Sequence, residues 1–164
     1  MPNTYKAVEV GAPGSLRIIE RPIPQPTEGQ VLIRVEACGV CHTDSLTVEG
    51  QFPGLRFPRV PGHEVTGRIE AVGSGVSQWR FRQRVGVGFF GGSDGHCELC
   101  RRGNFINCQN LTISGISMDG GYAEMIDRRV NCRRCCPTAA RQLISSSASS
   151  ASVPLSAHPL AYVW

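Results

Sequence analysis

Alternation of apolar and polar residues predicts that most of this chain is β structure. Apolar residues occupy every second position from Val31 to Val35, which is the pattern of a strand with one buried face. Shorter segments of the same kind lie at 4–10, 16–20, 65–72, 84–88 and 122–126. Clusters rich in glycine and proline separate them, as is typical of turns. Many short strands joined by such turns predict an irregular β-barrel or sandwich.

One segment has the features of a helix. Residues 43–50 begin with a capping residue, Thr43, and end at Gly50, which is a common residue just after a helix. We expect few and short helices elsewhere.

A glycine motif at 86–91 invites a nucleotide-binding interpretation, which we reject. The letters match the G-x-G-x-x-G fingerprint, but that motif works only where its last glycine opens a helix that holds the pyrophosphate. Turn sequence follows instead, so the segment is interpreted as a glycine-rich strand and turn.

Composition narrows the class of protein. The chain has 164 residues, of which 41% are hydrophobic and 18% charged, as in soluble globular proteins. No apolar run approaches the roughly 18 residues that span a bilayer, and the N-terminus does not resemble a secretory signal. We therefore expect a cytoplasmic protein without a membrane partner, in which the eight cysteines are ligands or free thiols.

The charge is unevenly distributed and divides the chain. The net charge is +4, but residues 1–127 carry 12 basic and 13 acidic residues, whereas 128–164 contain five arginines and no acid. All 19 glycines lie at or before Gly121. The sequence predicts one domain over 1–127, with no basic footprint for nucleic acid, and a basic, Ser/Ala-rich tail over 128–164 that is disordered or irregular.

Four residues in one loop have the spacing of a metal site. Cys97 and Cys100 are separated by two residues, which lets a turn present both sulfurs to one ion; Asp94 precedes them and Cys108 follows. This array predicts a tetrahedral structural zinc site. The alternative is a loop that contains three unconnected reduced cysteines.

A second set of ligand types is divided between two segments. Cys41 precedes His42, Thr43 and Asp44, and His63 precedes Glu64. One thiol, one imidazole and an adjacent acid are typical of a catalytic zinc site, which keeps one position open for substrate. Taken alone, each residue could be structural.

Both sets in this order resemble the zinc-containing medium-chain alcohol dehydrogenases. The similar stretches cover residues 4–124; they are Ala37–Asp44, Pro61–Gly67, Val72–Val76, Cys97–Asn110 and Gly120–Glu124. The resemblance implies a GroES-like β-barrel, the N-terminal catalytic part of such an enzyme, which converts an alcohol to an aldehyde or ketone with NAD or NADP.

The resemblance also implies roles for single residues. Cys41 and His63 would bind the catalytic zinc, and Glu64 would be an acid able to exchange onto the metal. Thr43 would begin the relay that removes the alcohol proton, Asp44 would orient the imidazole of His63, and His42 would lie near the cofactor phosphates. Partners implied are a small alcohol or aldehyde and, as in family members, further copies of the chain.

The sequence departs from the family in several places. Asp94 stands where the first structural cysteine is usual, and Arg82 replaces a glycine, which should strain a tight turn. The third catalytic ligand has no counterpart among Cys132, Cys135 and Cys136, and the nucleotide-binding domain is missing. We interpret the tail as a shifted reading frame, a retained intron or a mispredicted gene end. The alternative is a genuine appendage with Cys132 and Cys135 as a metal or redox motif.

Two functions follow from these features. The first is a zinc-dependent alcohol dehydrogenase, of which this chain would be an inactive truncation. The alternative is a non-enzymatic, zinc-stabilised barrel that serves as a binding module.

The truncation hypothesis gives a prediction about the cofactor. The 164-residue chain should bind neither NAD nor NADP saturably and should not oxidise alcohols, because its one G-x-G-x-x-G motif lacks the helix that holds a pyrophosphate. Isothermal calorimetry with each cofactor measures this. Saturable binding would revive a functional short enzyme.

Overall fold

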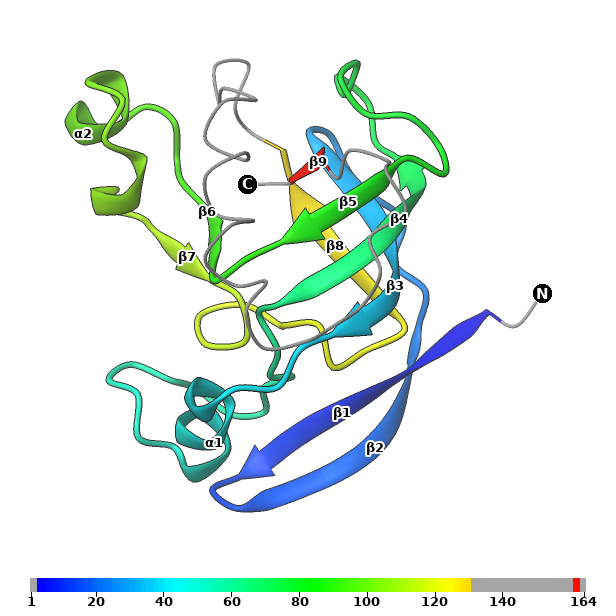
Figure 1. Ribbon diagram of the computed structural model, residues 1–164, viewed down its shortest axis with the longest axis vertical. Helices are drawn as coiled ribbons and strands as arrows, with labels where there is room; N and C mark the ends of the chain where they lie inside the picture. Colours follow the sequence, from blue (N-terminus) through cyan, green and yellow to red (C-terminus); the bar gives the residue numbers. More distant parts are fainter. Residues whose placement is uncertain (1–2, 131–160, 163–164) are drawn as a thin grey trace, which may run out of the picture.

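The computed structural model describes residues 3–130 and the short strand at 161–162, and its elements are mainly strands (Figure 1). In chain order they are β1 (Thr4–Ala12), β2 (Ser15–Pro22), β3 (Gln30–Cys38), α1 (His42–Glu49), β4 (Val65–Val72), β5 (Arg84–Val87), β6 (Phe90–Gly92), α2 (Glu98–Arg101), the 3₁₀ turn η1 (Phe105–Asn107), β7 (Thr112–Ile113), β8 (Met125–Arg129) and β9 (Ala161–Tyr162). The expected mainly β fold is confirmed.

The described strands form three sheets, none of which is closed on itself. β1 and β2 form an antiparallel hairpin, β6 pairs with β7, and the largest sheet has the order β8-β3-β4-β5-β9. The pairs from β8 to β5 are antiparallel, and β9 runs parallel to β5. In Figure 1 the hairpin lies beneath the large sheet, and α1 lies beside the hairpin. The adjacent strands β3, β4 and β8 are far apart in sequence.

The core lies against the large sheet, as the alternation predicts. Val31 and Ile33 of β3 are both fully buried. Leu32 is buried too, at 3% exposure, so this part of β3 is covered on both faces. The core cluster draws residues from four strands and from the residue after β8; its members are Val31, Ile33, Val65, Ile69, Val85, Val87, Ile126 and Val130. Burial of these side chains contributes about 1.5–3 kcal/mol each to folding.

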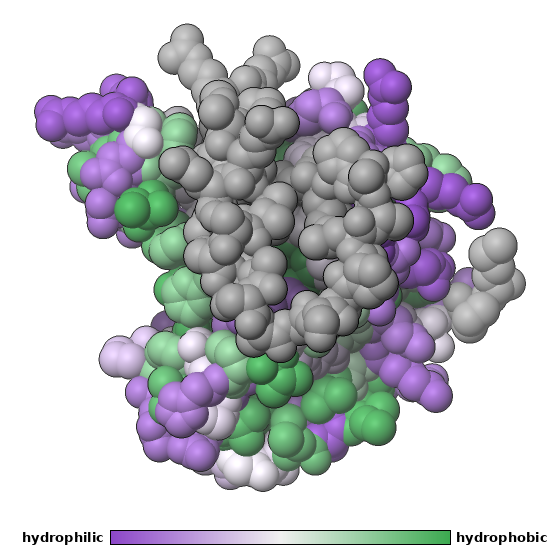
Figure 2. Space-filling view, in the orientation of Figure 1, coloured by the Kyte–Doolittle hydropathy of each residue, from purple (hydrophilic) through white to green (hydrophobic). Residues whose placement is uncertain are grey.

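The surface of the hairpin is partly apolar. Leu16 and Ile18 of β2 are 53% and 74% exposed. Figure 2 shows apolar residues gathered at the bottom of the view, where β1, β2 and α1 lie.

Helix α1 confirms the predicted helix but begins earlier. Its N-cap is Cys41, whose sulfur accepts the backbone N–H of Thr43, and the Asp44 side chain accepts the N–H of Cys41 in return. Gly50 ends the helix in the left-handed conformation, as expected. The cap is therefore the cysteine that we predicted as a metal ligand, and Thr43, the expected capping residue, lies inside the helix. Neither of the described helices is long and apolar enough to cross a membrane.

The segment 86–91 is a strand and turn, as interpreted from the sequence. β5 ends at Val87, β6 begins at Phe90, and the next helix is α2, which starts seven residues after the last glycine of the motif. The motif therefore has no helix N-terminus to offer a pyrophosphate.

The strand β8 extends past residue 127. It continues through Arg129, and Arg128 and Val130 are 1% and 8% exposed. Ordered packing thus includes three residues that we expected to lie in the tail. The three cysteines at 132, 135 and 136 and the serine-rich segment lie outside the described residues.

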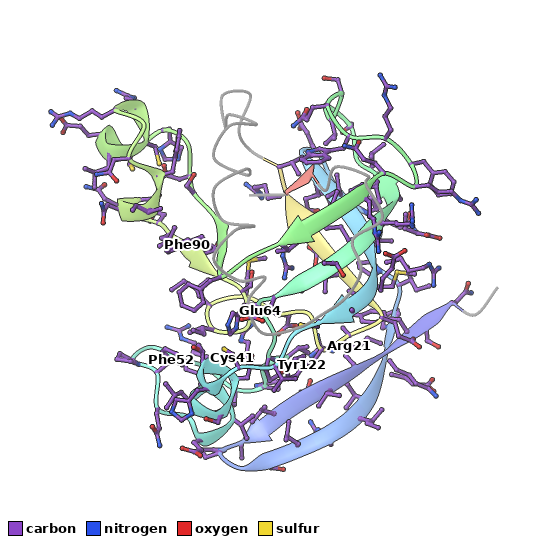
Figure 3. The ribbon with its side chains drawn as sticks, in the orientation of Figure 1. Arg21, Cys41, Phe52, Glu64, Phe90 and Tyr122 are labelled. Carbon is purple, nitrogen blue, oxygen red and sulfur yellow. The ribbon has the colours of Figure 1, made fainter. Side chains whose placement is uncertain are left out.

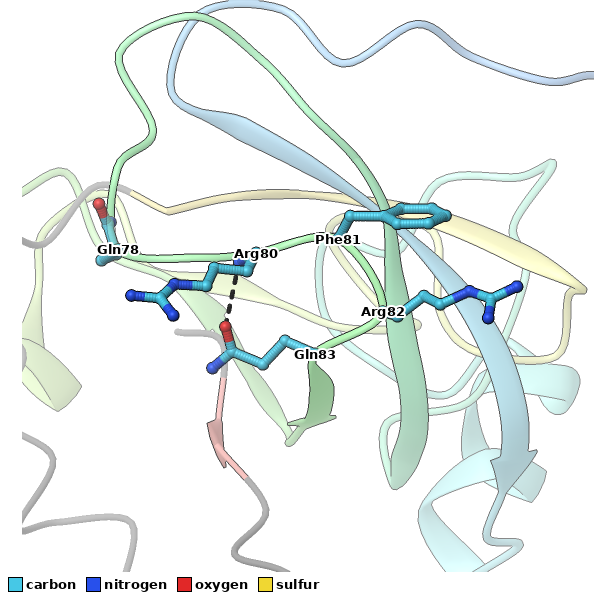
Figure 4. A pocket seen from close by; sticks show the side chains of 5 residues that line it. All are labelled: Gln78, Arg80, Phe81, Arg82 and Gln83. Atoms are coloured by element: carbon cyan, nitrogen blue, oxygen red, sulfur yellow. Dashed lines mark hydrogen bonds between the residues drawn. The ribbon is translucent and has the colours of Figure 1, made fainter.

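The loop between β4 and β5 contains the expected strained residue. Arg82 has a φ of 63°, which makes it the only non-glycine residue in the described part of the chain with a positive φ. Its guanidinium lies over the ring of Phe81, 5.6 Å from the centroid. Both residues line a surface hollow of about 580 Å³ together with Gln78, Arg80 and Gln83 (Figure 4). The hollow contains none of the predicted metal ligands.

Relief of this strain should stabilise the protein. Arg82→Gly should raise the free energy of unfolding by about 0.5–1 kcal/mol. A left-handed conformation costs an L-residue roughly 1–2 kcal/mol, and the greater freedom of glycine in the unfolded chain offsets part of the stability gained when this strain is removed. Chemical denaturation measures the change. Arg80→Gly in the same loop is the matched control and should destabilise; equal effects of both variants would show that strain at 82 contributes nothing.

Candidate metal centres

The segment 59–63 carries His63 and is held by the turn at 119–122. The backbone N–H groups of Gly120, Gly121 and Tyr122 donate to the carbonyls of Val60, Gly62 and Pro61 at 2.7, 2.9 and 3.0 Å. The Asp119 carboxylate accepts the N–H of Val60 at 3.1 Å. These bonds fix the backbone that leads into His63.

Close backbone approach explains two of the glycines in this contact. A Cβ on Gly120 would lie 2.1 Å from the carbonyl oxygen of Gly62, and a Cβ on Gly62 would lie 2.7 Å from the ring of Tyr122. Gly62 also has a φ of 100°, which disfavours any L side chain. Glycine is therefore required at both 62 and 120, because the two backbone segments approach each other closely at this one contact.

Asp119 connects this contact to the hairpin through charge. Its carboxylate bonds to Arg21 of β2 at 2.6 Å and to Arg59 at 2.9 Å. Arg21 and Arg17 also bond to Glu9, which is 4% exposed. The charges compensate one another, because the buried carboxylate of Glu9 and the partly exposed carboxylate of Asp119 each have two guanidinium partners.

The first group of ligand atoms is formed where this segment meets the start of α1. Cys41 Sγ lies 3.2 Å from His63 Nε2. On the other side of the ring, His63 Nδ1 lies 3.3 Å from Asp44 Oδ1. A histidine whose Nδ1 faces a carboxylate presents Nε2 as the metal-binding nitrogen. In the view of Figure 3, the labelled Cys41, Glu64 and Tyr122 lie in the same part of the picture, between the large sheet and α1.

Asp44 is fixed by several contacts. It is 4% exposed and accepts the N–H of Cys41 at 2.9 Å and the N–H of Gly62 at 3.2 Å. The ring of Phe89 packs edge-on against His63, with centroids 5.3 Å apart. Ligand atoms of Cys41, Asp44 and His63 all lie within 4.8 Å of one another.

The other predicted residues of this centre lie at its margin. Glu64 is exposed and is not among the converging ligand atoms; its carboxylate faces Gly39, where a Cβ would lie 2.2 Å from Oε2. Thr43 is half-buried and donates its N–H to Cys41 Sγ. His42 is exposed on α1, where its ring contacts Ser45. The structure thus unites three of these six residues.

The second group of ligand atoms is the loop array expected from the sequence. One ligand atom from each of Asp94, Cys97, Cys100 and Cys108 lies within 4.8 Å of the others, and the three cysteines are buried. Cys97 caps the short helix α2, accepting the N–H of Cys100 at 3.4 Å. Local turns therefore bring all four residues together.

Hydrogen bonds favour negative charge on two members of this group, Asp94 and Cys97. Bonds from the N–H of Cys97, the side chain of Asn110 and the N–H of His96 hold the pKa of Asp94 well below its usual range. Backbone N–H groups, of Gln109 first, lower the pKa of Cys97. Burial and the neighbouring thiols raise the pKa of Cys100 to about 12. A thiol with a high pKa beside other acidic groups ionises readily only when a cation compensates the charge.

Both groups have donor sets that fit zinc. Three thiols and a carboxylate around one point satisfy the four ligands of a structural zinc site. The Cys41 group supplies a thiol and an imidazole in contact, with Asp44 behind the imidazole, which is fewer than the four ligands of a closed site. By contrast, burial raises the pKa of the nearby Cys38 to about 11, and this thiol belongs to neither group.

Comparison with known proteins identifies the family. The model of the alcohol dehydrogenase GroES-like domain matches residues 27–138. The alcohol dehydrogenase patD of Aspergillus clavatus is 45% identical over 127 residues, which are 77% of this chain and 32% of that protein. An alcohol dehydrogenase of Geobacillus stearothermophilus is 42% identical over 110 residues, 66% of this chain and 33% of that protein. The chain belongs to the alcohol dehydrogenase GroES-like domain family.

Solved structures show the same fold. RspB of Escherichia coli, an alcohol dehydrogenase complexed with NADH, has a TM-score of 0.70 and 36% identity over 78% of this chain and 37% of its own. A thermostable alcohol dehydrogenase of Pyrobaculum aerophilum, also solved with cobalt and zinc bound, has a TM-score of 0.71 and 33% identity, covering 77% of this chain and 39% of its own. The chain spans about a third of the length of the curated relatives it matches.

Three residues near the centres were given no role by the sequence. Asp119 is 98 residues from Arg21 and 60 from Arg59, so no local pattern connects them. The Tyr122 hydroxyl is buried without a hydrogen-bond partner in the described part of the chain, and burial and Asp44 raise its pKa. Asn110 bonds to Asp94 across 16 residues.

The pKa of Asp119 predicts a pH-dependent contribution to stability. Burial raises this pKa, but bonds from Arg21 and Val60 and the charge of Arg59 hold it below its ordinary value. Because the folded pKa is lower than the unfolded one, ionised Asp119 stabilises the fold above about pH 4, and this contribution is lost as the pH falls below that value.

Asp119→Asn should therefore lower the free energy of unfolding at pH 7 by about 1 kcal/mol and much less at pH 3. Urea denaturation at both pH values measures this. Asp127→Asn is the control and should change stability by less than about 0.5 kcal/mol, because within the described residues the Asp127 side chain accepts one hydrogen bond, from Gln30 at 3.3 Å. An equal loss at both pH values for Asp119→Asn would contradict the assignment.

Proposed function

We propose that this chain provides the zinc-binding, substrate-activating part of an NAD- or NADP-dependent alcohol dehydrogenase, which interconverts an alcohol with an aldehyde or ketone. The observation that carries the proposal is the approach of Cys41 Sγ to His63 Nε2 at 3.2 Å, with Asp44 at Nδ1 of the same ring. Family membership and relatives that are alcohol dehydrogenases support it.

Cys41 and His63 would hold the catalytic zinc. Bound there, zinc would act as a Lewis acid that lowers the pKa of an alcohol oxygen. Asp44 keeps the imidazole in the orientation that presents Nε2, since its own carboxylate is fixed by two backbone N–H groups. Glu64 follows His63 directly and would serve as the exchangeable acid.

Thr43 would accept the proton that leaves the alcohol. Its place in the first turn of α1, with its backbone N–H on Cys41 Sγ, puts the residue directly beside this centre. His42 points from the exposed side of the same turn and would contact the cofactor phosphates. RspB, which was solved with NADH, supports a nicotinamide cofactor for the complete enzyme.

Asp94, Cys97, Cys100 and Cys108 would hold a second, structural zinc. Ligands that come from one short loop can order that loop only when the metal offsets the repulsion between thiolates. We propose that this zinc stabilises the segment 94–108, which contains only short helical turns of its own.

The two centres should differ in metal occupancy. The purified chain should contain about one zinc, held by the Asp94–Cys108 loop, because that ligand set is complete within the described residues. The Cys41 centre should bind metal more weakly, with Cys41, His63 and at most Glu64 as protein ligands.

Elemental analysis and Co²⁺ titration of three serine variants test the assignment. Cys97→Ser should remove the tightly bound zinc. Cys41→Ser should remove only the absorption bands of the more weakly bound Co²⁺, together with the change in these bands that ethanol causes when it binds to the metal. Cys38→Ser, which changes a thiol outside both groups, should alter neither. Loss of the tight zinc in Cys41→Ser but not in Cys97→Ser would reverse the assignment; an ethanol response that survives Cys41→Ser would refute the proposed substrate site.

A further inference from the structure

Three N–H groups of the described residues donate to the Asp94 carboxylate, and they are divided unequally between its oxygens. Oδ1 accepts the backbone N–H groups of His96 and Cys97, both at 2.9 Å. Oδ2 accepts the side-chain amide of Asn110 at 2.7 Å. The Asp94 side chain is 10% exposed, so solvent contributes little to its hydrogen bonding.

This division decides which oxygen is available to a metal. A carboxylate oxygen has two lone pairs, and both on Oδ1 are engaged by N–H groups. Oδ2 keeps one free lone pair. Asp94 therefore has one position left for a cation among the three cysteine sulfurs, and that position is on Oδ2.

Asn110 contacts the ligand set twice. Its side chain donates to Asp94 Oδ2, and its backbone N–H donates to Cys108 Sγ at 3.3 Å. The side chains of the two other asparagines of the loop, Asn104 and Asn107, bond to each other at 2.8 Å and make no hydrogen bond to a ligand within the described residues. Asn110 is thus the one asparagine side chain of this loop that reaches a ligand oxygen.

We infer that Asn110 is a positioning residue that makes Asp94 a one-oxygen metal ligand, equivalent to a fourth sulfur. This inference rests on the proposed zinc site of the loop. A carboxylate can otherwise turn about its last bond and offer either oxygen or both, whereas a thiolate offers one atom. With Oδ1 engaged by the backbone and Oδ2 held by Asn110, the carboxylate cannot turn, and its free lone pair stays in the centre of the ligand set.

The inference predicts that Asn110 matters only when position 94 is an aspartate. Asn110→Ala removes the side-chain bond but keeps the backbone N–H to Cys108. In the otherwise unchanged chain it should weaken Zn²⁺ binding by about 10–100-fold, the usual cost of losing a group that orients a ligand. In an Asp94→Cys background the same change should alter Zn²⁺ affinity by less than about twofold, since a sulfur needs no orientation by the amide.

Competition with a chromophoric chelator measures Zn²⁺ affinity for the unchanged chain, Asn110→Ala, Asp94→Cys and the double variant. Asn107→Ala is the matched control and should leave affinity within about twofold, because within the described residues the Asn107 side chain makes no hydrogen bond to a ligand. The visible spectrum of the Co²⁺ form adds a readout: Asn110→Ala should shift the ligand-field bands and leave the sulfur-to-cobalt charge-transfer intensity unchanged, since three thiolates remain.

Each other outcome overturns a defined part of the inference. Equal weakening by Asn110→Ala in both backgrounds would mean that Asn110 only packs the loop. Unchanged affinity and spectrum in Asn110→Ala would mean that the backbone N–H groups alone orient Asp94. A chain that binds no metal through Cys97 would refute the zinc site itself, and with it the role of Asn110.

Discussion

The contact between the segment 60–62 and the turn at 120–122 is the constraint on which the rest of the candidate catalytic centre depends. Three backbone hydrogen bonds of 2.7–3.0 Å hold the two segments together. Glycine is required at the contact because a Cβ on Gly120 would lie 2.1 Å from a backbone oxygen. His63 follows directly, so the position of its imidazole is set by backbone packing before any metal binds.

Charged groups around Asp119 connect this contact to the surrounding sheets. The Asp119 side chain bonds to Arg21 of β2 and to Arg59, and its carbonyl oxygen accepts the buried Arg128 guanidinium of β8 at 2.9 Å. Burial lowers the pKa of Arg128 to about 10, which leaves it charged at neutral pH. The hairpin, the large sheet and the segment that carries His63 thus meet at one residue. A buried charge of this kind favours one arrangement, because a shifted strand would leave it without a partner.

The two candidate metal centres are built in different ways. The Asp94–Cys108 group is local: its ligands come from 15 consecutive residues, and turns with N–H to sulfur bonds bring them together. The Cys41 group combines the start of α1 with His63, which is 22 residues later in the chain and is held in place by the turn at 120–122. A local group can be assembled by the metal as the loop folds, whereas the second requires the fold first.

The difference explains what the sequence by itself determined. Alternation at 31–35 indicated a strand, Gly50 indicated the end of a helix, and the spacing of Cys97, Cys100 and Cys108 indicated a metal loop, because each pattern depends on neighbours a few residues apart. The strain at Arg82 was likewise readable, since φ is a property of one residue and its turn. Only the tertiary structure decided that Cys41 caps α1 in contact with His63, that Glu64 stays at the margin of that centre, and that Asn110 holds Asp94. The Cys41–His63 and Asn110–Asp94 contacts join residues 22 and 16 positions apart, and no periodicity along the chain records which segments will meet.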